Sequence, residues 1–145
     1  MKPSFNLPTK TIWGFLLLVL IFRLAYIHMV PLQLVPDEAY YWDWSRHLDI
    51  GYYSKPPMVA WLNYISTSLF GINEFGVRFF AALFGTASVG ILYMLAREMF
   101  DENVALLSSL VALLTPANAA LSFVMTIDPP LIFFWNTIPA FFCGK

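Results

Sequence analysis

The sequence predicts an all-α membrane protein, and three observations support this fold class. Hydrophobic residues make up 59% of the 145 residues, whereas charged residues make up 12%, far below the roughly 25% that is typical of soluble domains. Several apolar runs approach the roughly 20 residues that a membrane-spanning helix needs. Acids, bases and aromatics instead gather in one connecting stretch, residues 31–78. We therefore expect about four transmembrane helices with a structured outer loop.

The four expected spans differ in how well they suit a bilayer. They cover about residues 12–30, 79–100, 104–125 and 131–142. No small-residue cleavage site follows the first span, so we expect a retained anchor rather than a signal peptide. This span contains Arg23, and an arginine inside a span usually faces a protein interior or a watery cavity, with snorkelling or pairing with further parts of the protein as the alternatives. The last span is short, and we therefore interpret residues 1–145 as the N-terminal portion of a larger membrane domain.

Small and helix-breaking residues predict how the later spans pack. The second span has two pairs of small residues four apart, Ala81 with Gly85 and Thr86 with Gly90. This spacing lets helices approach closely in lipid. Pro116 interrupts the third span, which predicts a kinked or broken helix there. Two prolines follow Asp128 and can start the fourth helix.

Alternation of the spans predicts a topology. With the N-terminus in the cytoplasm, the loop of residues 31–78 faces outward and the turn at residues 97–103 faces inward. Asp128 then returns to the outer side, where it shares a face with Asp37 and Glu38.

The outer loop is too long for a passive connector, and its pattern predicts two helices. The first runs from about residue 37 to residue 48 and carries an aromatic stripe suited to the headgroup zone, with Tyr40, Tyr41, Trp44 and Leu48. The second begins at Pro56 and is expected to bury one apolar face, with Met58, Trp61, Leu62, Ile65 and Leu69. Two helices lying along the membrane surface would enclose a cavity at the boundary.

Each charged candidate in this loop has a purely structural alternative. Asp37 suits a helix N-cap, a first-turn Glu38 favours the helix dipole, and Lys55 is typical of a headgroup contact. Glu74 and Arg78 are four apart and most simply form a surface ion pair. The aromatic residues suit an interfacial belt as well as a sugar platform. Asp128, likewise, suits a cap of the fourth helix.

Composition argues against several other classes of protein. The net charge is −1, and the chain has no basic tract, Gly-rich phosphate loop or zinc-type Cys/His spacing. We therefore expect no nucleic-acid partner, mononucleotide site or structural zinc. The single cysteine, Cys143, cannot form an internal disulfide.

Three ordered motifs resemble one family of enzymes. They are PDEAYYWDWSRHLDIGYYSKPPMVAWL, EFGVRFFAALFGTASVGILYMLAREMF and TIDPPLIFFW. They are similar to the N-terminal part of the dolichyl-phosphate-mannose protein mannosyltransferase-like family, which includes the bacterial aminoarabinose transferases of lipid A and belongs to the type-C (GT-C) integral-membrane glycosyltransferases. The resemblance implies a multi-pass protein of the bacterial inner membrane. It also implies that a sugar passes, with inversion, from a polyprenyl-phosphate carrier to a lipid, glycan or protein acceptor on the periplasmic face.

The resemblance also implies roles for particular residues. Asp37 matches the catalytic base of the family. The expected substrate-binding residues are Glu38, Tyr41, Tyr52, Lys55 and Asp128, with Lys55 at the donor phosphate and Asp128 at substrate or a cation.

Two departures bear on cofactor and substrate. Aminoarabinose-type members commonly carry a metal-binding Glu at the position of Ser54 and Arg at that of Tyr40. The sequence therefore argues against aminoarabinose transfer, predicts no certain cofactor and leaves a divalent cation open.

Two further classes of function stay open from the sequence. A non-enzymatic membrane subunit or headgroup-binding scaffold would explain the aromatic belt, though not the ordered acid and lysine motifs. A transporter fragment would explain Arg23 and the interrupted third span, but no inverted repeat is visible. For a glycosyltransferase, we expect residues 1–145 alone to be inactive, because a preorganised site needs its complete cavity.

Overall fold

The computed structural model describes residues 9–30 and 32–143, and all regular elements in this part of the chain are helices. They are α1 (Thr9–Met29), α2 (Pro36–Ser45), α3 (Met58–Phe70), α4 (Glu74–Met99), α5 (Glu102–Leu114), α6 (Pro116–Leu121) and α7 (Asp128–Cys143). The all-α prediction is confirmed for the described residues. The predicted domain, residues 1–145, extends beyond them at both ends.

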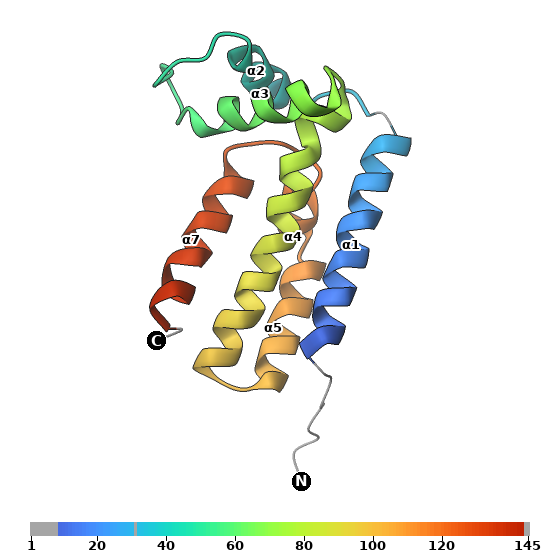
Figure 1. The fold of residues 1–145 in the computed structure, drawn as a ribbon, viewed down its shortest axis with the longest axis vertical. Coiled ribbons are helices and arrows are strands. Elements are labelled where there is room, and N and C mark those ends of the chain that lie inside the picture. The colour runs from blue at the N-terminus through green and yellow to red at the C-terminus, as the bar shows by residue number, and fades with distance from the viewer. Residues whose placement is uncertain (1–8, 31, 144–145) are drawn as a thin grey trace.

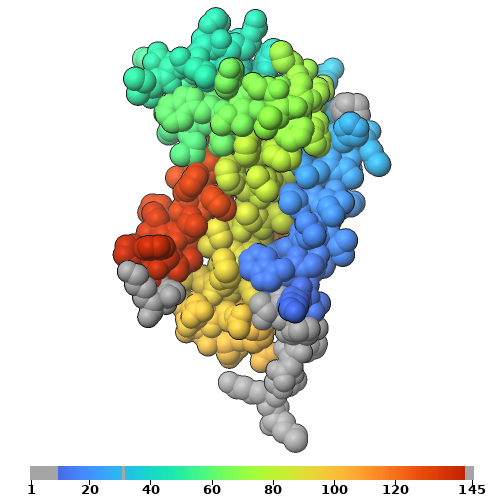
Figure 2. All heavy atoms as spheres, viewed as in Figure 1, coloured from blue at the N-terminus to red at the C-terminus, as the bar shows by residue number. Residues whose placement is uncertain are grey.

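Helix α4 forms the centre of the fold and contacts α1, α3, α5, α6 and α7. Helices α1, α4, α5 and α7 lie alongside one another, and α2 and α3 lie across one end of this bundle (Figure 1). Figure 2 shows atoms of α3 covering that end, with atoms of α4 visible between those of α1 and α7. We call this end the capped end.

Small residues of α4 allow its neighbours to approach closely. A Cβ atom added to Gly85 would lie 2.9 Å from Cβ of Ser122, which follows α6. One added to Gly90 would lie 2.9 Å from the indole of Trp13 in α1. The prediction of close packing along this face is therefore confirmed.

Arg23 faces the protein interior, as its position in α1 predicted. Its guanidinium is buried, and Nη1 donates a 2.8 Å hydrogen bond to Oγ1 of Thr86 in α4. The hydroxyl of Thr86 in turn donates to the backbone carbonyl of Ala82.

Local signals in the sequence set the helix boundaries. Gly71 ends α3 with a φ of 89°, a conformation that glycine adopts without strain. The side chains of Asn73 and Asp101 cap α4 and α5 by accepting hydrogen bonds from backbone N–H groups three residues later. The predicted break at Pro116 is confirmed, because α5 ends at Leu114 and α6 begins at Pro116.

Within residues 9–30 and 32–143, two helices are long and apolar enough to cross a membrane. They are residues Lys10–Met29 and Glu74–Met99, and they correspond to the first two predicted spans. The third predicted span is divided between α5 and α6, and α7 is 16 residues long. The total of four spans therefore stays a prediction.

The predicted orientation of α3 is wrong. Its buried residues are Val59, Ala60, Asn63 and Ser66, whereas Met58, Trp61, Ile65 and Leu69 are exposed, and Leu62 is partly buried. Small residues let α3 approach α2 and α4 closely, so its small side chains face the rest of the protein and its bulky apolar ones face outward. The expected first loop helix also ends earlier, at Ser45, and Leu48 lies exposed beyond it.

Candidate active site

The first turn of α2 places Asp37 and Glu38 in opposite surroundings. Val35 is the N-cap residue and Pro36 occupies the first helical position, where its missing N–H costs nothing. Asp37 follows and is exposed, whereas Glu38 is fully buried. The alternative that Asp37 caps this helix is therefore wrong.

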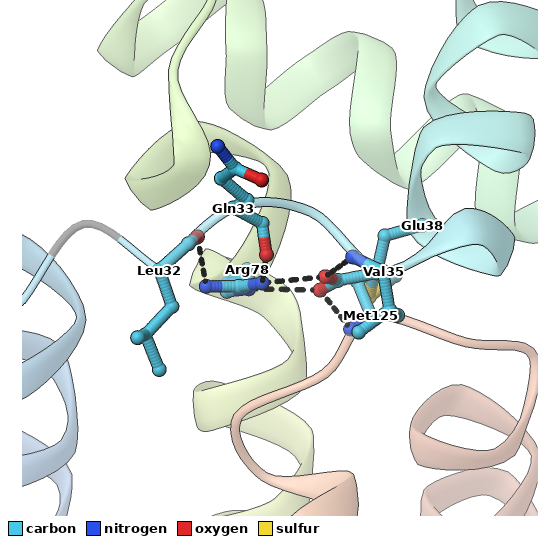
Figure 3. Close-up of polar contacts among 6 residues, drawn as sticks. All are labelled: Leu32, Gln33, Val35, Glu38, Arg78 and Met125. Atoms are coloured by element: carbon cyan, nitrogen blue, oxygen red, sulfur yellow. Dashed lines mark hydrogen bonds and ion pairs between the residues drawn. The ribbon is translucent and has the colours of Figure 1, made fainter.

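Glu38 and Arg78 form a buried ion pair that joins distant parts of the chain (Figure 3). The Nε and Nη2 atoms of Arg78 donate to Oε1 and Oε2 of Glu38 at 2.9 and 2.6 Å. Each Glu38 oxygen also accepts one backbone N–H, from Met125 at 2.9 Å and from Val35 at 3.1 Å. Arg78 also donates from Nη1 to the carbonyl of Leu32 and from Nη2 to the carbonyl of Gln33. We call this group the Glu38–Arg78 clamp.

The clamp corrects the expected surface ion pair of Arg78 and bears on both expected roles of Glu38. Arg78 is buried and pairs with Glu38, so the expected surface ion pair with Glu74 is wrong. Glu38 is more than a favourable charge at a helix start. Both of its oxygens are engaged and it is 0% exposed, so it offers no free acceptor to a substrate. We therefore interpret Glu38 as a positioning residue.

The clamp also fixes the geometry of the capped end. Arg78 belongs to α4, Glu38 to α2 and Met125 to the segment just before α7. A buried carboxylate that accepts four N–H groups at these distances restrains all three segments. It therefore holds Asp37 and Asp128, each a few residues from the clamp, at the same end of the molecule.

Tyr41 is a buried phenol on which two carboxylates, Asp37 and Asp128, act electrostatically. Its ring is 4% exposed, and burial raises the pKa of its hydroxyl above the ordinary value of 10.0. The negative charges of Asp37 and Asp128 raise the pKa of Tyr41 further, as does Tyr40. Both carboxylates therefore lie close enough to act on one phenol, and we call Asp37, Tyr41 and Asp128 the acidic face.

The two carboxylates of the acidic face are held differently. Among the described residues, Asp37 has neither a hydrogen bond nor an ion pair to its side chain. Asp128 is partly buried, and its Oδ2 accepts a 2.9 Å hydrogen bond from the hydroxyl of Thr126. Its own backbone N–H donates to the same hydroxyl oxygen at 3.3 Å. Asp37 is thus the carboxylate of the acidic face whose oxygens are free to accept hydrogen bonds from molecules in the solvent.

Four aromatic rings continue from the acidic face towards the loop that follows α2. The centroids of Tyr40 and Tyr41 lie 4.5 and 5.5 Å from that of Trp44. Tyr52 stacks on Trp44 with a centroid distance of 4.3 Å and an interplanar angle of 3°. We call these residues, Tyr40, Tyr41, Trp44 and Tyr52, the aromatic wall.

Tyr52 anchors the loop through hydrogen bonds of its hydroxyl to the backbone. That hydroxyl contacts the carbonyls of Trp44 and His47 at 3.0 and 2.9 Å and accepts the N–H of Asp49 at 3.2 Å. Its donor-contacting role, expected from the family, stays a prediction.

Lys55 lies on the loop that also carries Tyr52. Its side chain is exposed, and among the described residues it makes no hydrogen bond or ion pair. The loop is fastened to α3 through Trp61, whose Nε1 donates to the carbonyl of Asp49 at 3.1 Å. The structure thus brings Asp37, Tyr41 and Asp128 together, whereas the side chain of Lys55 makes no hydrogen bond or ion pair with the described residues.

The carboxylates of the acidic face are the type of ligand that a hard cation prefers, but they are too few to complete its coordination. Within the described residues no group of three or more His, Cys, Asp or Glu side chains could hold a metal ion. Mg²⁺ and Ca²⁺ take six or more oxygen ligands, so Asp37 and Asp128 would supply only part of a coordination shell.

Sequence comparisons identify relatives of this region. The 36% identical undecaprenyl phosphate-alpha-4-amino-4-deoxy-L-arabinose arabinosyl transferase 2 of Proteus mirabilis aligns over 69% of this chain and 21% of its own length. A lipid A galacturonosyltransferase of Rhizobium johnstonii is 32% identical over 79% of this chain and 24% of its own. A putative mannosyltransferase of Bacillus subtilis is 37% identical over 54% of this chain and 12% of its own. No solved structure matches.

The extent of these matches settles the family. The chain spans about a quarter or less of the length of these relatives, as the 24% and 21% coverages state. The sequence model for dolichyl-phosphate-mannose-protein mannosyltransferase matches residues 54–143, which is more than half of the chain. The chain therefore belongs to the dolichyl-phosphate-mannose-protein mannosyltransferase family of GT-C glycosyltransferases.

Proposed function

We propose that the intact protein containing residues 1–145 transfers a sugar from a polyprenyl-phosphate carrier to an acceptor, with Asp37 as the general base. One observation carries this proposal: Asp37 is an exposed carboxylate without a bonding partner in the described residues, on a helix start that the buried clamp holds in place. A relative named for an undecaprenyl-phosphate-linked sugar supports the donor class.

In the proposed reaction, Asp37 accepts the proton of the acceptor nucleophile while that atom attacks the anomeric carbon of the sugar. The bond between that carbon and the phosphate oxygen breaks, and its electron pair leaves with the polyprenyl phosphate. Attack opposite the leaving group inverts the configuration. A well-placed general base contributes typically about 10²- to 10⁴-fold in rate.

Other residues stabilise charge and orient groups. Lys55 binds the donor phosphate and stabilises the negative charge that grows as the phosphate leaves. Tyr41 keeps its proton over a wider pH range than a free tyrosine, so it serves as a neutral hydrogen-bond donor beside the carboxylates. Asp128 binds the substrate or, together with Asp37 and substrate oxygens, a divalent cation. Tyr52 contacts the donor through the exposed part of its ring.

The membrane arrangement follows from the same proposal. We place α1, α4, the α5–α6 pair and α7 across the bacterial inner membrane, with α2 and α3 along its periplasmic surface. The capped end and the acidic face then lie on the periplasmic side, where a lipid, glycan or protein acceptor is reached.

The decisive test replaces Asp37 in the intact protein. Asp37→Asn keeps size and polarity but removes the base, so sugar transfer from a radiolabelled polyprenyl-phosphate donor should fall by about 10²-fold or more. Asp43→Asn is the matched control, because Asp43 is an exposed carboxylate of the same helix, 3.9 Å from Arg46. Both variants should insert into membranes like the wild type. Wild-type turnover by Asp37→Asn protein would remove Asp37 from the base role.

A second comparison tests how much of the site residues 1–145 contain. Membranes holding only this segment should give no transfer, because the cavity around Asp37 needs further protein to exclude water. Transfer by the segment alone would contradict that expectation. Binding of lipid headgroups by an intact protein that transfers no sugar would favour the scaffold instead.

A further inference from the structure

Tyr40 is the ring of the aromatic wall that is open to a ligand. It is 48% exposed, whereas Tyr41 is 4% exposed and both Trp44 and Tyr52 are partly buried. Because its neighbours are covered, a molecule approaching the wall from solvent meets Tyr40 first. The outer surface of this ring is used by none of the roles proposed above.

The wall holds Tyr40 in a fixed orientation. Trp44 is stacked in parallel on Tyr52, and the hydroxyl of Tyr52 is tied to the loop backbone. Tyr40 rests against the indole of Trp44 with a centroid distance of 4.5 Å and an interplanar angle of 56°. A ring held in this way binds a flat apolar face without losing much conformational freedom on binding.

The position of Tyr40 relates this ring to the reacting atoms. Tyr40 follows Asp37 by three residues in α2, so the two side chains share one side of the helix, with Cβ atoms roughly 5–6 Å apart. A sugar whose anomeric carbon lies near Asp37 would extend over the Tyr40 ring. Pyranose and furanose rings carry a face of C–H groups that packs against aromatic rings.

Building on the proposed function, we infer that Tyr40 stacks on the sugar ring of the donor. Tyr40 is then a specificity-determining residue. It recognises the sugar rather than the lipid carrier, which distinguishes it from a ring of an interfacial belt.

Equilibrium binding by the intact protein in lipid nanodiscs tests this inference. The probes are undecaprenyl phosphate and undecaprenyl-phosphate mannose, each radiolabelled. The wild type should bind the mannose lipid more tightly than the sugar-free lipid. Tyr40→Ala should weaken binding of the mannose lipid by about 2- to 10-fold and leave the sugar-free lipid unchanged.

Two variants serve as controls for this measurement. Tyr40→Phe retains the aromatic face and should bind like the wild type. Tyr53→Ala removes a fully exposed tyrosine of the neighbouring loop and should also bind like the wild type.

The remaining outcomes overturn the inference. Equal weakening of sugar-bearing and sugar-free lipids by Tyr40→Ala would make Tyr40 a lipid-belt residue. An unchanged affinity of that variant for the mannose lipid would also refute it. Transfer that depends on Asp37, together with sugar binding that is indifferent to Tyr40, would refute this inference and leave the proposed function intact. Sugar binding that depends on Tyr40, in a protein that transfers no sugar, would support this inference and refute the proposed function.

Discussion

Asp37 and Glu38 are neighbours in the chain, yet they belong to two regions with opposite properties. Glu38 is 0% exposed and accepts four hydrogen bonds within the clamp. Asp37 is exposed and accepts none from the described residues. Successive residues of a helix point roughly 100° apart, so one turn can direct one acid into the core and the next into solvent. Glu38 stabilises the fold, and Asp37 is left available for chemistry.

This difference has a physical basis. A charge removed from water is tolerated only when it is paired and hydrogen-bonded, so the clamp must be complete. A carboxylate that acts as a general base, the role proposed for Asp37, needs free lone pairs, so we expect the acidic face to contribute little to stability. The comparison predicts that equivalent substitutions in the two regions will have very different effects.

Glu38→Gln should produce the largest loss of stability. The amide removes the charge, leaves Arg78 unpaired in the interior and places an NH₂ group against N–H donors. Breaking a buried pair in this way costs about 3 to 5 kcal/mol in the free energy of unfolding, measurable by denaturation of the protein in detergent micelles. Arg46→Gln is the control, because its 3.9 Å contact with Asp43 is exposed and contributes less than about 1 kcal/mol. Similar losses in both variants would contradict the distinction between clamp and surface.

Gly85→Ala should have the second largest effect. The added methyl would lie 2.9 Å from Cβ and 3.1 Å from Cα of Ser122, so the backbone that leads to Met125 must shift. Overpacking of this kind costs roughly 1 to 3 kcal/mol. Gly14→Ala is the matched control, since nothing lies within 4 Å of a Cβ at Gly14 and alanine favours a helix by about 0.5 to 1 kcal/mol. The thermal unfolding midpoints should move in opposite directions, and movement of both in the same direction would contradict the packing argument.

Asp37→Asn should change stability least among these substitutions. Exposed groups outside capping networks usually contribute within about 0.5 kcal/mol, and the first-turn charge adds a few tenths through the helix dipole. The unfolding free energy should therefore stay within about 1 kcal/mol of the wild type. Denaturation in the same detergent gives the measurement, and a loss as large as that of Glu38→Gln would show that Asp37 supports the fold.

The sequence predicted features that depend on local pattern. The small-residue spacing around Gly85 indicated close helix packing, Pro116 indicated a break, and the position of Arg23 indicated an inward direction. Two predicted spans separate the outer loop from Asp128, so the sequence indicated that Asp37 and Asp128 share one face of the membrane. Their joint effect on the pKa of Tyr41 agrees with this prediction.

The features that the sequence missed depend on tertiary structure. Arg78 and Glu38 are 40 residues apart, and no helical periodicity relates them. The nearer Glu74, four residues before Arg78, suggested a local pair instead. The buried face of α3 was misjudged because bulky apolar residues were taken to face inward, whereas Ala60 and Ser66 form the contact surface. Only the assembled bundle shows which side is covered.

The pH dependence of Tyr41 provides the most delicate test of the acidic face. Burial, followed by the charges of Asp37 and Asp128, raises the pKa of its hydroxyl above 10.0 in the folded protein. Below about pH 10 the phenol is neutral in both folded and unfolded states, and its contribution to stability is fully present. Above that pH the unfolded state releases the proton first, so the folded state binds more protons and stability falls as pH rises.

Tyr41→Phe should remove this contribution, so its stability should decline less steeply than that of the wild type as pH rises through the tyrosine range. Asp37→Asn should lower the pKa of Tyr41 only part of the way to 10.0, because burial is the larger cause and stays in place. Tyrosinate absorbance, taken as the difference between proteins with and without Tyr41→Phe, measures both pKa values. Asp43→Asn, which removes a charge that does not act on Tyr41, should leave the titration unchanged. If Asp37→Asn also left it unchanged, Asp37 would lie too far from Tyr41 for the two to share one site.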